Sequence, residues 1–82
     1  MELVEEVKSI LGAAFPPPDK IELGDDDGIV GSVVSARFEG MEMIDRINLI
    51  WDLLDNELPR EKRRRVILIV AATPEESIVF SG

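Results

Sequence analysis

The stretch VVSARFEGMEMIDRINLIWDLL, Val33–Leu54, decides the fold because an alternating pattern changes at Gly40 into a helical one. Residues 29–38 predict a strand, and Gly40 permits the sharp change of direction that follows it. The expected inner face of this strand holds Val30, Val34, Ala36 and Phe38, and the more exposed positions are Ser32, Ser35 and Arg37. Ile29 and Val33 fall out of phase with this set, so partial cover of both faces, as in a middle strand, is the alternative. Gly31 is a candidate for a β-bulge within it.

A long helix is expected from Met41 to about Glu57, and Pro59 ends it. Its apolar residues recur at helical spacing in one stripe: Ile44, Ile47, Trp51, Leu54 and Leu58, with Met43 and Ile50 beside them. The polar residues expected to lie largely away from this stripe are Asp45, Arg46, Asp52 and Asp55. The stripe predicts the main contact with a sheet, worth about 1.5–3 kcal/mol for each well-buried side chain.

Two further elements precede this region. An amphipathic helix of about three turns is indicated by the spacing of Leu3, Val4, Val7, Ile10 and Leu11. Pro16–Pro18 end it, as a rigid connector in the favoured interpretation and as a proline-rich ligand in the other. Lys20–Leu23 then predicts a short strand, and Gly24–Gly28 a turn. Its acids, Asp25–Asp27, fit a solvated turn better than a calcium loop, since a distant bidentate glutamate is missing.

The C-terminal part predicts a strand followed by a short helix. Val66–Ala72 is almost uninterruptedly apolar, as in strands covered on both faces. The sequence Thr73-Pro74-Glu75-Glu76 has the pattern of a capping box with proline at the first helical position. An extended course for Ile78–Phe80 is the alternative.

The expected order is therefore α-β-β-α-β-α in one domain, residues 1–82. A hairpin and a right-handed crossover place the last strand parallel to the second. The fold class is α+β, with helices packed on a three-stranded mixed sheet.

Composition removes several kinds of chemistry. The 82 residues include no cysteine and no histidine, so disulfides, thiol nucleophiles and the commonest metal ligand are excluded. The net charge of -8 argues against general binding of polyanions. The start, MELVEEV, lacks a basic leader, and no apolar run reaches the length of a membrane span, so we expect a cytoplasmic protein without membrane contact.

Several motifs together resemble the BolA-like family over about Leu23–Glu76. They are SARFEGM, an arginine six residues after Gly40, a helix ending near Leu58, and a buried strand ending in ATPEE. The residues that carry the match are Phe38, Glu39, Gly40, Thr73, Pro74 and Glu76. The resemblance implies a class II KH-like fold and a non-enzymatic protein that pairs with monothiol glutaredoxins, often through a shared iron-sulfur cluster. Some members are DNA-binding regulators in stress and cell-shape responses.

The chain departs from the family where metal is bound. The resemblance puts the main histidine ligand at Arg65, at the start of the last strand, and a second ligand near Gly28. Neither residue binds iron, so we expect no metal and no cofactor on this chain. The family's arginine-histidine-arginine run is here Arg46-Ile47-Asn48.

The basic run Arg60–Arg65 has three interpretations: a solvated loop, a contact for an acidic protein surface, or a nucleic-acid contact. If the helix end and this connection fold onto one side, the candidate binding patch contains Arg37, Arg46, Lys62, Arg63, Arg64 and Arg65. No aromatic residue is interleaved with the run, and no GxxG loop is apparent. Glu39 and Glu42 have no second group that would tune them for catalysis.

The sequence therefore predicts a non-enzymatic adaptor or regulator that acts through a protein partner, by resemblance a monothiol glutaredoxin. The alternative is a weak nucleic-acid-binding transcription regulator. A second copy of the chain is a further possible partner.

Overall fold

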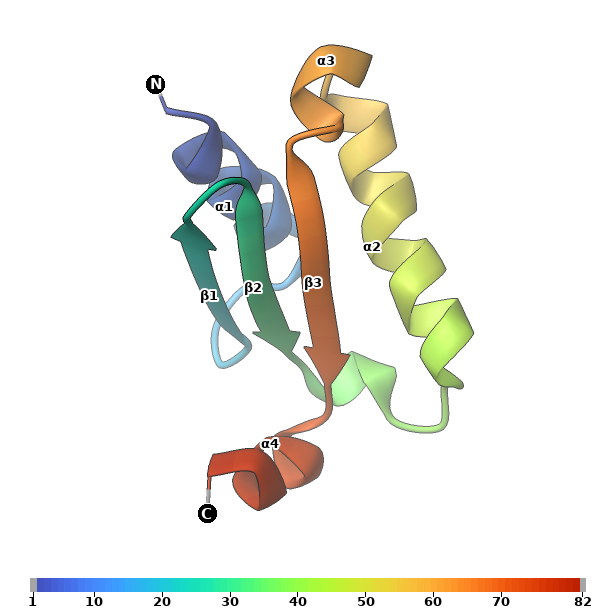
Figure 1. The fold of residues 1–82 in the computed structure, drawn as a ribbon. Helices are drawn as coiled ribbons and strands as arrows, with labels where there is room; N and C mark the ends of the chain where they lie inside the picture. Colours follow the sequence, from blue (N-terminus) through green and yellow to red (C-terminus); the bar gives the residue numbers. More distant parts are fainter. Residues whose placement is uncertain (1, 82) are drawn as a thin grey trace.

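The computed structural model describes residues 2–81 and shows helices and a three-stranded sheet in the expected order (Figure 1). The elements are α1 (Leu3–Ala14), β1 (Lys20–Asp25), β2 (Ile29–Val34), the 3-10 helix η1 (Ala36–Phe38), α2 (Met43–Glu57), α3 (Arg60–Arg63), β3 (Val66–Ala72) and α4 (Pro74–Ser81). The α+β class is confirmed, and α4 is helical rather than extended. Two short helices, η1 and α3, are additions to the predicted order. No helix in the described part of the chain is long and apolar enough to cross a membrane.

The sheet has the order β1-β2-β3. β1 and β2 form an antiparallel hairpin, and β2 pairs with β3 in parallel, as the crossover predicts. The register places Ile29 opposite Val66 but Val30 opposite Leu68, so β3 carries the extra residue, Ile67. The bulge therefore lies on β3 and not at Gly31.

One face of the sheet is covered. α1 contacts β1 and α2, and α2 contacts β3, while no helix of residues 2–81 lies over the opposite face (Figure 1). The core between them consists of Leu3, Val7, Leu11, Phe15, Ile29, Val33, Phe38, Ile50, Leu54, Leu58, Val66, Ile69 and Ala71. The expectation that β3 is covered on both faces is wrong, because a single helical layer leaves Ile67, Leu68 and Val70 exposed.

The predicted phase of β2 is also wrong. Ile29 and Val33 face the core, whereas Val30 is exposed. The strand ends at Val34, because Ser35 caps η1: its hydroxyl accepts the Arg37 backbone N–H at 3.1 Å and donates to Asp19 Oδ2 at 2.8 Å. Ser35 is consequently buried, and the 3-10 turn leaves Ala36 exposed. Phe38 is buried as expected.

Helix α2 begins at Met43, two residues later than predicted, and it is rotated about its axis. The face on the core carries Arg46, Ile50 and Leu54. Ile44, expected in the core, is 59% exposed, and Ile47 and Trp51 are half-buried. The rotation follows from the burial of the Arg46 side chain.

Candidate functional site

The Arg46 side chain links the SARFEGM motif (residues 35–41) to the ATPEE motif (residues 72–76). Its Nε donates to Met41 O at 3.1 Å, and its Nη1 donates to Glu76 Oε1 at 2.6 Å and to Ala71 O at 3.5 Å. The guanidinium also lies 6.0 Å from the centre of the Phe38 ring. Arg46 is 6% exposed, so these contacts occupy a residue that the sequence suggested for binding.

The capping box at the start of α4 is confirmed. The Thr73 N–H donates to Glu76 Oε1 at 2.9 Å, and the Glu76 N–H donates to Thr73 Oγ1 at 3.2 Å. The hydrogen bond from Arg46 and then that from the Thr73 backbone hold the pKa of Glu76 below its ordinary value of 4.5, against a smaller opposing effect of burial. The Glu76 carboxylate thus contacts Arg46 of α2 and the backbone of Thr73 between β3 and α4.

Replacing this carboxylate, Glu76→Gln, is expected to make the protein less stable at pH 7. Because the folded-state pKa is lowered, the stabilisation is present above pH 4.5 and is lost as the pH falls through the folded-state pKa. The difference between wild type and variant should therefore shrink on acidification, as measured by urea unfolding at pH 7 and pH 3. The neighbouring Glu75→Gln is the control, and equal effects of the two substitutions would contradict the assigned role of Glu76.

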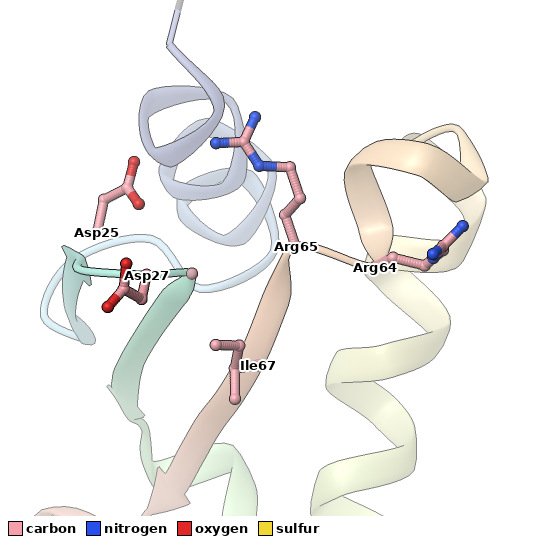
Figure 2. Close-up of a pocket in the computed structure, with 6 residues that line it drawn as sticks. Asp25, Asp27, Arg64, Arg65 and Ile67 are labelled. Carbon is pink, nitrogen blue, oxygen red and sulfur yellow. The ribbon is translucent and has the colours of Figure 1, made fainter.

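A charged cleft lies at the opposite end of the sheet (Figure 2). Its lining residues are Asp25, Asp27, Gly28, Arg64, Arg65 and Ile67. Figure 2 shows Arg65 rising from the start of β3 beside α1, with Arg64 turned toward α3. The hairpin turn supplies the acids, and Gly28 has a φ of 130°, at which a side chain is strained.

Gly28 and Arg65 are close neighbours in this cleft. The Ile29 N–H donates to Arg65 O at 2.8 Å, and a Cβ on Gly28 would overlap the Ile67 side chain. The structure therefore unites the two positions at which the resemblance places the metal ligands. Arginine and aspartate here do not fit an iron-sulfur cluster, which prefers thiolate or imidazole, and the guanidinium groups repel cations. No metal-binding group of three or more His, Cys, Asp or Glu occurs among the described residues.

The basic run is only partly free. Lys62 Nζ lies 3.0 Å from Glu6 Oε1. The Arg63 guanidinium stacks 3.7 Å from the Trp51 ring centre, and its Nε makes a 2.8 Å charge contact, not an aligned hydrogen bond, with Asp55 Oδ1. Arg60, Arg64 and Arg65 are exposed, and no ion pair of theirs is found among the described residues.

The six candidate residues do not form one patch. Lys62, Arg63, Arg64 and Arg65 lie together where β3 begins, but Arg37 follows the end of β2. Since β2 and β3 are parallel, the two groups are separated by about 20 Å, the length of a six- to seven-residue strand. Arg37 donates to Ala14 O at 2.7 Å and lies over the Phe15 ring, and Arg46 is at the same end.

The uncovered face of the sheet is a surface that the sequence did not reveal. Val30, Leu68 and Val70 are exposed there, with Ile67 at the bulge. The sequence feature that relates to this surface is the continuous apolar run of β3, but such a run fits a strand buried on both faces equally well.

No protein-family model and no curated protein matches the chain. Solved structures do match it. The solution structure of BolA1 from Mus musculus has 26% identity and a TM-score of 0.74, over 100% of this chain and 73% of that one. The BolA domain of SufE1 from Arabidopsis thaliana has 25% identity and a TM-score of 0.73, over 93% of this chain and 96% of that one. BolA1 from Arabidopsis thaliana, at 22% identity, has the same TM-score and coverage and supports the fold.

Proposed function

We propose that this BolA-like protein is a non-enzymatic adaptor or regulator that acts through a protein partner, and that the partner is a monothiol glutaredoxin. One observation carries the proposal: a BolA-like fold presents charged side chains, Arg64, Arg65, Asp25 and Asp27, at the cleft where the resemblance places metal ligands. Charged groups of both signs at the rim of a contact favour selective docking of a complementary protein surface.

The same cleft limits the role of any iron-sulfur cluster. Because Gly28 and Arg65 supply no suitable donor, every protein ligand of a cluster in the complex would come from the glutaredoxin. The chain would then contribute contacts alone. A cytoplasmic site of action and a role in stress or transcriptional regulation belong to this proposal.

A titration with a purified monothiol glutaredoxin tests this function. We expect a complex with both the cluster-free and the cluster-bound partner, and the visible absorption of the cluster should not change on binding, since this chain adds no ligand. Replacing Arg64 and Arg65 together by alanine should weaken the complex by about tenfold, whereas the distant Arg37→Ala should have little effect. A spectral shift like that of a ligand exchange would contradict the proposed role.

The alternative is nucleic-acid binding, which the exposed Arg60, Arg64 and Arg65 favour. Binding of a single-stranded oligonucleotide would then weaken as salt increases, with a slope set by about three contacts, and would require Arg64 and Arg65. A flat salt response, measured by fluorescence anisotropy, would exclude this function.

A further inference from the structure

The outer edge of β1 borders an open cleft. β1 is the outermost strand on its side of the sheet (Figure 1). The cleft lies between this strand and α1, and its lining residues are Val4, Glu5, Lys8, Ile21, Glu22 and Leu23. Val4, Ile21 and Leu23 pack against the core but are half-buried, so apolar side chains reach the surface at this edge. A strand added here would extend the sheet and cover these side chains.

The backbone of β1 has free hydrogen-bonding groups at this edge. The Ser35 N–H donates to β3 at 3.0 Å. Because backbone groups alternate in direction along a strand, Ser32 faces β1, where its register partner is Glu22. The N–H and C=O groups of Ile21 and Leu23 therefore point away from the sheet, and within residues 2–81 neither backbone has a hydrogen bond from a loop or turn.

The charges along this edge are self-complementary. Lys20 and Glu22 are exposed and alternate with the core-facing residues of β1, and Glu5 and Lys8 are exposed on α1 beside the cleft. None of these four side chains has an ion-pair partner in the described part of the chain. Each element thus carries one acid and one base, which an identical surface related by a two-fold axis can pair.

One two-fold register of the two β1 strands pairs both strand charges. With Ile21 opposite Ile21 of a second copy, Lys20 lies opposite Glu22 twice, and the two Ile21 residues exchange backbone hydrogen bonds. A register centred on Glu22 puts like charges opposite each other, and one centred on Leu23 leaves Glu22 opposite Gly24. Because the chain has a net charge of -8, self-association requires such local pairing.

We propose that two copies of this chain associate through their β1 edges, in antiparallel register about Ile21, and form one continuous sheet. Lys20 and Glu22 make reciprocal ion pairs across the seam, and the two α1–β1 clefts join over it. The contact involves fewer than the about 20–30 residues per side of a standard interface, so we expect a weak dimer with a Kd of about 100 μM. The inference goes beyond the proposed function and does not depend on a glutaredoxin.

Sedimentation equilibrium of the chain from about 10 μM to about 1 mM measures the association. We expect a monomer at the low end and mainly a dimer at the high end. Over the same range the Ile21 amide should exchange about fivefold more slowly, because its N–H becomes bonded to the second copy. A monomer throughout, or a dimer in which Ile21 exchanges at the monomer rate, would overturn the inference.

Charge-reversal variants locate the seam. Lys20→Glu and Glu22→Lys should each weaken the dimer by at least about tenfold, because each puts like charges opposite each other twice. Net charge alone would change association in opposite directions in the two variants. Glu57→Lys, an exposed position on α2, is the control and should have an effect of less than about twofold.

An equimolar mixture of Lys20→Glu and Glu22→Lys should form a mixed dimer about as tight as that of wild type, since opposite charges again meet at both positions. Circular dichroism confirms that the variants fold. A mixture that stays monomeric, or a Glu22→Lys protein that dimerises like wild type, would overturn the inference.

A glutaredoxin is the other candidate for this edge, and the Ile21 amide distinguishes the two. If a glutaredoxin slows its exchange and a higher concentration of the chain does not, the edge binds the partner and the proposed dimer is wrong. If the chain dimerises and no glutaredoxin binds, the dimer is confirmed and the proposed partner is wrong.

Discussion

Replacing Gly31 by alanine is expected to destabilise the protein by more than about 3 kcal/mol, a large part of the about 5–15 kcal/mol typical of a folded domain. Gly31 pairs with Leu23 across the hairpin. A Cβ at Gly31 would overlap Glu22 O and lie 2.6 Å from Leu23 Cδ2 and 2.9 Å from Leu23 Cα. Since two of these atoms belong to the backbone, β1 has to move away from β2, which disrupts the antiparallel hairpin.

Gly12→Ala is the matched control. Gly12 lies in α1 with no atom within 4 Å of an added Cβ, so alanine should stabilise the protein by about 0.5–1 kcal/mol. Urea unfolding followed by circular dichroism measures both changes. A Gly31→Ala protein as stable as wild type would show that β1 and β2 do not approach each other as described.

Replacing Arg46 by alanine is expected to lower the free energy of unfolding by about 2–4 kcal/mol. The change removes the donors to Met41 O and Ala71 O, unpairs Glu76 and leaves a void beside Phe38. These losses affect the connection of α2 to β3 and α4. Thermal unfolding measures the loss of stability, and amide exchange in α4 measures the loss of its connection to α2.

Arg37→Ala is the comparison for this prediction. Arg37 also donates to a carbonyl, Ala14 O, and also lies over a phenylalanine ring, Phe15, but it is exposed. Its removal should therefore change the free energy of unfolding by less than about 1 kcal/mol. Similar losses in the two variants would show that the burial of Arg46 has no special consequence.

Local spacing was sufficient to predict much of the fold. The hairpin follows from Gly24–Gly28 between two apolar runs, and the capping box follows from Thr73 and Glu76 three residues apart. The parallel pairing of β3 with β2 follows from the handedness of crossovers. Each of these rules depends on neighbours in the chain or on a general property of sheets.

The orientation of α2 depends on distant residues and could not be read in the same way. An arginine at position 46 counts as polar in a helical pattern and is assigned to the outside. Its burial requires Glu76, thirty residues away, and the Phe38 ring. The exposure of Leu68 and Val70 likewise depends on the number of helical layers, which the composition of β3 does not reveal.

The position of the cleft was predictable only from the family resemblance. The resemblance directed attention to Gly28 and Arg65, and the structure places them in one cleft. The six candidate basic residues lie at two opposite ends of the sheet, because the parallel strands β2 and β3 hold Arg37 and Arg65 about one strand length apart. The exposure of Ile44 was not predicted because the whole apolar stripe of α2 was assigned to the core.

The most direct test of the proposed adaptor role is a calorimetric titration of the chain with a cluster-free monothiol glutaredoxin. We expect a saturable complex of one copy each, with a Kd of about 10 μM or tighter. Absence of binding at about 100 μM of both proteins, repeated with the cluster-bound partner, would contradict it.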